Sequence, residues 1–242
     1  MGLKEDIKLG NNDALIIVDV QNDFIPGGAL PVPAGDQVVP VLNEYIKLFK
    51  KEGAGVFATR DWHPPNHVSF KAYGGPWPPH CIQQSEGAKF HPDLKLPADS
   101  SIISKAMNPS KESYSGFDET ELDDKLRTQG VKKVFVGGLA TDYCVKNTVL
   151  DAIKLGFKPV LLLDAIQGIN AKPGDTEKAI DEMSLKGAEK ITLADFPEPS
   201  EIPQEEFTDE TLGESPLVKV ETKKKARMRP RGPYKRVRTE LG

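Results

Sequence analysis

Short apolar runs alternate with helical patterns along most of this chain, and that alternation constrains its fold more than any other feature. The runs have the length of buried strands, and they lie at residues 14–18, 56–59, 101–104, 134–136, 159–163 and 191–193. Periodic apolar residues predict helices at residues 36–51, 119–129, 141–155 and 175–186. Continuous apolar strands that alternate with amphipathic helices predict an α/β fold, with an open, mostly parallel six-stranded sheet and helices on both faces.

The chain changes character at Phe196. Residues 197–242 contain six prolines, few apolar residues and no sustained hydrophobic period. Acidic residues gather at 198–214 and basic residues at 219–238. We therefore expect one domain over residues 1–196, followed by a disordered tail over residues 197–242.

Composition and charge exclude several classes of protein. The formal net charge of −4 gives no nucleic-acid signal for the whole chain, and two cysteines are too few for a disulfide scaffold. No apolar run in the sequence approaches the roughly 20 residues of a membrane span, and the first six residues lack the apolar core of a signal peptide. We therefore expect a cytoplasmic protein with no membrane partner. The sequence does not decide whether it forms a homo-oligomer.

Reactive side chains follow the predicted strands. Asp19 follows the first strand, Asp61 and His63 follow the second, Lys105 follows the third, and Cys144 lies beyond the fourth. In an open parallel sheet the carboxyl ends of the strands form the ligand-binding edge, so we expect these side chains to meet there. A lone aspartate at a strand end is usually a turn or cap residue, and a lone lysine is usually a solvated charge. Together, however, these groups have the pattern of a site.

Cys144 is the candidate nucleophile. It lies in the run Gly137–Val145, three residues after Thr141, the predicted N-cap of a helix. In the first turn of a helix, unpaired backbone N–H groups and the helix dipole favour a thiolate, and the same groups can hold an oxyanion. The alternative is a small buried hydrophobe, and this segment alone favours neither interpretation.

A carboxylate and several imidazoles form a candidate metal site. Asp61 and His63 lie two residues apart in extended chain, so both side chains point to one face. His67, His80 and His91 follow in an irregular stretch that is rich in proline and glycine. A ligand set of one Asp and two His suits zinc, iron or manganese. From spacing alone, the alternative is a group of solvated surface histidines.

Several segments together carry a family signature. They are Ile17–Phe24, Thr59–Pro64, Asn66–Phe70, Trp77–Cys81, Gly87–Pro92, Lys105, Tyr114–Phe117 and Gly138–Val145. In these segments, which span about residues 12–196 in family order, the chain resembles the nicotinamidases (pyrazinamidases) of the isochorismatase-like cysteine hydrolase superfamily. The Asp, Lys and Cys segments are typical of the superfamily, and the Asp-x-His and Trp-Pro-Pro-His-Cys segments are typical of its nicotinamidase members.

The resemblance implies roles for the residues at the ligand-binding edge of the predicted sheet. It implies a catalytic triad of Asp19, Lys105 and Cys144. It also implies an oxyanion hole from the backbone N–H groups of Ala140 and Cys144, presented by a cis peptide bond between Leu139 and Ala140.

The same resemblance implies a metal and a substrate pocket. One divalent metal ion would be held by Asp61, His63 and His80, with zinc expected ahead of iron or manganese. His67 matches a ligand of some members only, and His91 matches none. The residues that match the walls around a flat substrate ring are Phe24, Trp77 and Tyr114. For these aromatic side chains the alternative is ordinary packing.

The function that the resemblance implies is a metal-dependent cysteine amidohydrolase. Its substrate partner would be nicotinamide, converted to nicotinate and ammonia through a cysteine thioester in NAD salvage. One alternative is another small-amide hydrolase of the same superfamily. An alternative from another class rests on the tail, where the segment Lys223–Arg231 resembles a nuclear localisation or docking segment. That segment predicts an import receptor or nucleic acid as partner, and a nuclear location beside the cytoplasmic one.

Overall fold

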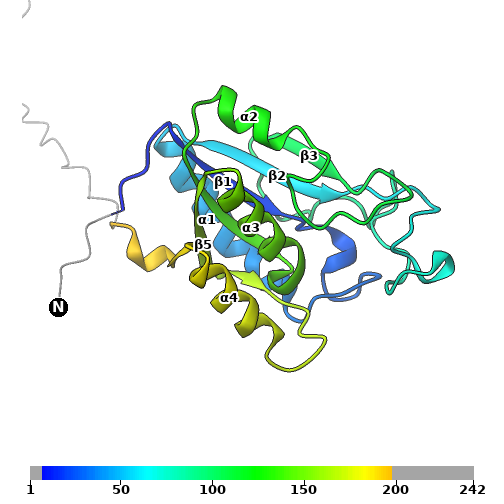
Figure 1. Ribbon diagram of the computed structural model, residues 1–242. Helices are drawn as coiled ribbons and strands as arrows, with labels where there is room; N and C mark the ends of the chain where they lie inside the picture. Colours follow the sequence, from blue (N-terminus) through cyan, green and yellow to red (C-terminus); the bar gives the residue numbers. More distant parts are fainter. Residues whose placement is uncertain (1–6, 198–242) are drawn as a thin grey trace, which may run out of the picture. The chain divides into compact units, whose positions relative to one another are not determined.

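The computed structural model describes residues 7–197 (Figure 1). The predicted tail therefore lies, apart from its first residue, outside the described residues, and so does the basic segment Lys223–Arg231. Within the described range, no helix combines the length and the hydropathy that crossing a membrane would require.

Six parallel strands form one sheet in the described part of the chain. The strands are β1 (Asp13–Val18), β2 (Gly55–Asp61), β3 (Ser101–Lys105), β4 (Lys133–Leu139), β5 (Lys158–Gln167) and β6 (Glu189–Ile191). Their order across the sheet is β3-β2-β1-β4-β5-β6, and each neighbouring pair is parallel. The predicted six-stranded α/β sheet is confirmed.

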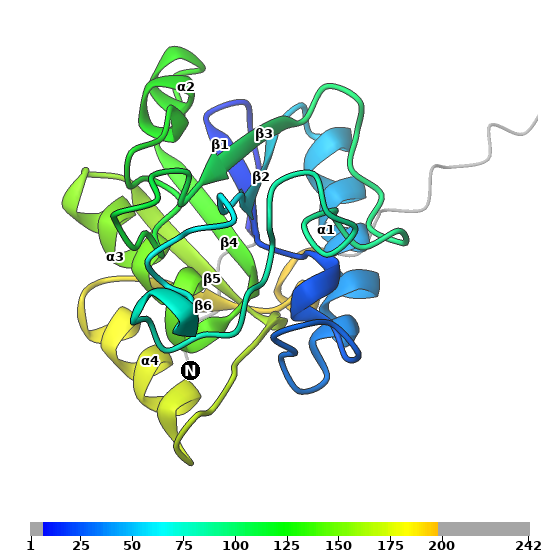
Figure 2. The same ribbon diagram turned by 90° about the vertical axis from the view of Figure 1, so that its right-hand side faces the viewer.

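Helices cover both faces of this sheet (Figure 2). They are α1 (Val38–Lys51), α2 (Leu122–Thr128), α3 (Lys146–Lys154) and α4 (Asp175–Leu185). Side chains alternate along β1, so Leu15 belongs to the core cluster that includes the apolar side of α1, whereas Ile16 belongs to the cluster that includes α2, α3 and α4. Burial on both faces is the reason why the central strands read as continuous apolar runs.

Several element ends differ from the predictions, and those of α3 and β6 are two examples. The helix expected over residues 141–155 begins as a π-helical turn, Thr141–Val145, and continues as α3. Its N-cap is Ala140, so the prediction that Thr141 caps the helix is wrong. The last strand ends at Ile191, and residues Leu193–Asp195 form a 3₁₀ turn in place of the predicted strand end. Both differences lie at element ends, where hydrophobic periodicity carries little information.

The strand order places a topological switch point between β1 and β4. From β1 the chain proceeds outward to β2 and β3, and from β4 it proceeds the other way to β5 and β6. Side by side, Val18 of β1 pairs with Gly138 of β4. Gly138 has a φ of +115°, and a Cβ there would lie 2.2 Å from the Val18 carbonyl oxygen, so glycine is required at this crossing. Open α/β sheets bind ligands beyond the carboxyl ends of such strands.

Candidate active site

The predicted triad residues meet at this switch point. Asp19 directly follows β1, Lys105 is the last residue of β3, and Cys144 lies in the π-helical turn after β4. Lys105 Nζ lies 3.0 Å from Asp19 Oδ2 and 3.5 Å from Cys144 Sγ. The three residues are nearly inaccessible to solvent, at 0% exposure for Asp19, 1% for Lys105 and 6% for Cys144. The structure therefore brings an acid, a cation and a thiol together in one buried cluster.

Lys105 connects the triad to the candidate metal ligands. Its ammonium also forms an ion pair with Asp61 and donates to the Ser113 carbonyl at 3.4 Å. Burial alone would lower the pKa of Lys105, but the carboxylates of Asp19 and Asp61 outweigh burial and raise that pKa well above its usual value. Lys105 therefore stays a cation between two carboxyl groups, and it offsets the cost of burying them.

Burial sets the protonation of the other two triad members. It raises the pKa of Asp19, and the negative charge of Asp61 adds to this effect while Lys105 opposes it. It also raises the pKa of the Cys144 thiol well above its usual value, despite the nearby Lys105 cation. The expectation that the helix terminus favours a thiolate at Cys144 is thus wrong for the free site, because burial raises the pKa of the thiol more than the Lys105 cation lowers it. The thiol needs a base, and the adjacent Asp19 is the candidate.

Thr59 orients Asp19. Its hydroxyl donates to Asp19 Oδ1 at 2.6 Å, and the Asp19 N–H donates to the Thr59 carbonyl at 3.2 Å. Asp19 has a φ of +49°, so the chain turns sharply where β1 ends. With Oδ1 held by Thr59, Oδ2 faces Lys105.

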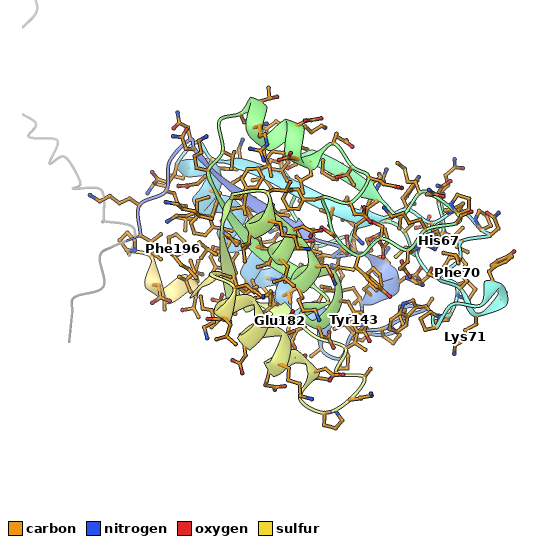
Figure 3. The ribbon with its side chains drawn as sticks, viewed as in Figure 1. His67, Phe70, Lys71, Tyr143, Glu182 and Phe196 are labelled. Carbon is orange, nitrogen blue, oxygen red and sulfur yellow. The ribbon has the colours of Figure 1, made fainter. Side chains whose placement is uncertain are left out.

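Asp142 holds the turn that presents Cys144. Its Oδ1 accepts from the N–H of Ile169 at 2.9 Å, and its Oδ2 accepts from the N–H of Asn170 at 2.8 Å. These bonds tie the π-helical turn to the loop that follows β5. Figure 3 shows the neighbouring Tyr143, in the middle of this turn, on the same side of the domain as His67 and far from Phe196.

The predicted cis peptide bond between Leu139 and Ala140 is present. The Ala140 carbonyl accepts from the N–H groups of Tyr143 and Val145, at 3.0 and 3.1 Å. Neither of these donors belongs to the pair expected to form the oxyanion hole.

The donor set Asp61, His63 and His80 fits a divalent metal ion. One ligand atom from each of these buried residues lies within 4.8 Å of the others, and His80 Nε2 lies 4.0 Å from Asp61 Oδ2. His63 Nδ1 is 3.1 Å from the His80 carbonyl, and His80 Nδ1 is 2.8 Å from the Pro78 carbonyl. Each bond leaves Nε2 as the nitrogen that could bind a metal ion, the arrangement common in metal sites. Burial lowers the pKa of His63 to about 4, which keeps its imidazole in the neutral, ligating form.

His67 lies beside this set with both ring nitrogens engaged. Its ring centroid is 4.4 Å from that of His63. Nδ1 is 2.7 Å from Ser69 Oγ, and Nε2 is 3.0 Å from the Lys111 carbonyl. As a ligand, His67 would have to give up one of these bonds.

The predicted ring-walling residues lie around the same cluster, and Tyr143 joins them. Trp77 Nε1 donates to the Tyr114 hydroxyl at 3.0 Å. The Tyr143 ring packs edge-on against Trp77, with centroids 5.1 Å apart, and 5.7 Å from Tyr114. Phe24 lies on the metal side, 5.5 Å from the His80 ring. These aromatic faces suit a flat ring.

Known proteins match this chain in sequence and in fold. A model of the isochorismatase domain matches residues 13–195. The chain belongs to the isochorismatase family.

Among its relatives, the nicotinamidase of Escherichia coli K12 is 45% identical over 206 residues, which cover 76% of this chain and 97% of the relative. A pyrazinamidase of Pyrococcus horikoshii, solved in complex with zinc, is 55% identical with a TM-score of 0.72, over 75% of this chain and 99% of that one. PnC1 of L. infantum, solved in complex with nicotinate, is 35% identical with a TM-score of 0.73, over 79% of this chain and 98% of that one.

Several residues of this isochorismatase-family site had no role in the sequence analysis. They are Gln21, Thr59, Asp142 and Tyr143. Tyr143 carried a usable signal, since an aromatic residue next to the candidate nucleophile must lie near any substrate. The others act through hydrogen bonds to residues at least 27 positions away, and no local pattern indicates such partners.

Proposed function

We propose that this protein is a nicotinamidase, which hydrolyses the carboxamide of nicotinamide to nicotinate and ammonia in NAD salvage. The observation that carries the proposal is the buried cluster in which Lys105 connects Asp19 and Cys144 to the metal-type set around Asp61. The relatives support the substrate class, since three that are 37–45% identical and a solved structure that is 55% identical are named nicotinamidases or pyrazinamidases.

In the proposed first step, Cys144 Sγ attacks the carboxamide carbon while Asp19 accepts the thiol proton. Because burial keeps the free thiol protonated, proton transfer and attack are expected to occur together. Lys105 lies 3.5 Å from Sγ and stabilises the negative charge that develops there. The backbone N–H groups of Ala140 and Cys144 would hold the oxyanion, at about 3 kcal/mol per donor.

In the second step the tetrahedral intermediate collapses to a thioester. Asp19 returns its proton to the leaving nitrogen, which departs as ammonia. Water then attacks the thioester carbon while Asp19 accepts a proton again. The C–S bond breaks, Asp19 returns the proton to Cys144, and nicotinate leaves.

Asp61, His63 and His80 would hold one divalent metal ion, for which we propose zinc. Such an ion supplies a Lewis acid for the pyridine nitrogen and for water near the thioester. His67 is left outside the proposed ligand set because both of its ring nitrogens are hydrogen-bonded.

The aromatic residues would hold the substrate ring. Phe24, Trp77 and Tyr114 are proposed as its walls, with Tyr143 behind the last two. Packing of this kind excludes water from the reacting carbon and accepts any flat heteroaromatic amide of similar size. We therefore expect pyrazinamide to be a second substrate.

Ammonia release by the purified protein tests the proposal. The wild type should release ammonia from nicotinamide, whereas Cys144→Ala and chelator-treated protein should not. Cys81→Ala, which removes the other cysteine of the sequence, is the matched control and should retain turnover. If the wild type cleaves a different amide but not nicotinamide, the substrate assignment is wrong. If Cys144→Ala retains full activity, the mechanism is wrong.

A second proposal concerns residues outside the described range. The basic segment Lys223–Arg231 is proposed to dock an import receptor or nucleic acid, which would give the protein a nuclear location as well. A salt titration of nucleic-acid binding, with the full chain and with a chain that ends at Phe196, tests the nucleic-acid alternative. The absence of salt-dependent binding by the full chain would end it. The shortened chain should retain turnover.

A further inference from the structure

Gln21 lies between the two halves of the proposed site and has no assigned role so far. Its side chain is fully buried. It is two residues beyond Asp19, and its own N–H donates to the Asp19 carbonyl at 2.8 Å. A buried carboxamide is costly unless both its donors and its acceptor find partners, so its contacts are informative.

The Gln21 carboxamide forms hydrogen bonds with both the N–H and the C=O of Asp61. Its Nε2 donates to the Asp61 carbonyl at 2.8 Å, and its Oε1 accepts from the Asp61 N–H at 2.7 Å. The second proton of Nε2 goes to the Ala88 carbonyl at 2.9 Å. The side chain therefore bonds both polar backbone groups of a proposed metal ligand.

The end of β1 explains why a side chain is needed at this point. β1 pairs with β2 only as far as Ile17 and Ala58, and the chain then turns away at Asp19, where φ is +49°. Asp61 is the last residue of β2, and its N–H and C=O face the space that β1 has left. A primary amide carries one donor and one acceptor on the same edge, so Gln21 continues the hydrogen-bond ladder where the strand ends.

We infer that Gln21 is a positioning residue for the metal site, because it fixes the backbone of Asp61 and thereby aims the Asp61 carboxylate at the ion. This inference rests on the proposed function, in which Asp61 is a metal ligand. Lys105 holds Oδ1 of that carboxylate, and Oδ2 faces His80. With its backbone also fixed, Asp61 presents one oxygen to the ion in a single orientation. Partners that orient a ligand in this way typically contribute 10–100-fold to metal affinity.

A nearby glutamine offers a matched control. Gln83 Nε2 donates to the carbonyl of Trp62, the residue after Asp61, at 3.0 Å. The side chains of both glutamines thus brace the same short segment, but of the two only the Gln21 side chain bonds Asp61 itself. If bracing of this segment were sufficient to maintain metal affinity, removal of either side chain would lower that affinity equally.

The experiment measures zinc binding to the metal-free full-length protein by competition with a chromophoric chelator. We expect Gln21→Met, which is similar in volume but has no amide, to weaken zinc binding about 10–100-fold. Gln21→Leu, which also removes both the donor and the acceptor without adding a charge, should lose affinity as well. Gln83→Met should stay within about threefold of the wild type. The absorption spectrum of the cobalt-loaded protein should change in the two Gln21 variants and not in Gln83→Met.

Two results would overturn the inference. One is zinc affinity at the wild-type level in both Gln21 variants, even if they unfold more easily, because that would make Gln21 purely structural. The other is an equal loss in Gln83→Met. A different failure concerns the proposed site itself: if Asp61→Ala binds zinc as tightly as the wild type, then Asp61 is not a ligand.

Discussion

Removal of the Asp142 carboxylate should loosen the turn that presents Cys144. Asp142 is 7% exposed, and it accepts two backbone N–H bonds from the loop after β5, at 2.9 and 2.8 Å. The substitution Asp142→Ala leaves both N–H groups without this acceptor. Thr141, at the start of the same turn, already has a buried hydroxyl without a hydrogen-bond partner among the described residues.

The expected cost follows from these two bonds. A hydrogen bond to a charged group contributes about 1.5–3 kcal/mol, and water can replace part of it because Asn170 is exposed. We therefore expect Asp142→Ala to lower the free energy of unfolding by about 3 kcal/mol. For a domain of this size that loss corresponds to a decrease in Tm of roughly 6–12 °C. Asp142→Asn keeps one acceptor oxygen and should lose about half as much.

Urea unfolding followed by circular dichroism measures the loss, and ammonia release measures turnover on the same samples. The control is Asn170→Gly, which removes the bond from the Thr176 N–H to Asn170 Oδ1 but keeps both bonds to Asp142. It loosens the same loop at a residue whose φ is +51°, a conformation that glycine adopts freely. Equal losses in Asp142→Ala and Asn170→Gly would refute the reasoning. So would an unchanged rate of Cys144 alkylation by iodoacetamide in Asp142→Ala.

Three further predictions follow from the geometry. Gly138→Ala should reduce the free energy of unfolding by about 3 kcal/mol or more, because the added Cβ would meet a β1 carbonyl oxygen at 2.2 Å. Gly156→Ala, where φ is also positive but nothing lies within 4 Å, should lose only about 1 kcal/mol in a parallel urea titration. Lys105→Met should lower the stability of the metal-free protein by about 3–5 kcal/mol, since two buried carboxyl groups lose their cation, and stability at the wild-type level would contradict this charge balance. Tyr114→Phe removes the acceptor of the Trp77 indole and should raise the KM for nicotinamide about 2–10-fold with little change in kcat, so an unchanged KM would count against these residues as ring walls.

Local sequence was sufficient to predict the strands and helices and the edge of the sheet at which the site residues gather. Runs such as residues 14–18 are apolar throughout because both faces of the central strands are buried, and this burial is visible as a pattern. Because parallel strands end at one edge, the residues after them were predicted to meet, and Asp19, Lys105 and Cys144 do meet there. The candidate metal set was predicted from the spacing of Asp61 and His63 and from the family resemblance at His80, and one ligand atom from each of the three lies within 4.8 Å of the others.

Protonation could not be predicted from the sequence. A cysteine in the first turn of a helix was expected to favour a thiolate, yet burial raises the pKa of Cys144 well above its usual value. Desolvation depends on how many atoms the whole fold places around a group, and a segment of nine residues does not contain that information. Burial is likewise the largest cause of the raised pKa of Asp19.

The sequence by itself determined the parallel α/β sheet, the edge at which its chemistry gathers and the types of residue found there. The tertiary structure alone decided which groups hold those residues in place. Gln21 bonds Asp61 across 40 positions, and Asp142 bonds Ile169 across 27. Such bonds exist because β1 turns away at Asp19 and because the loop after β5 returns beside the π-helical turn. Both facts depend on where strands end and how loops return in the tertiary structure, and hydrophobic periodicity within one segment does not indicate them.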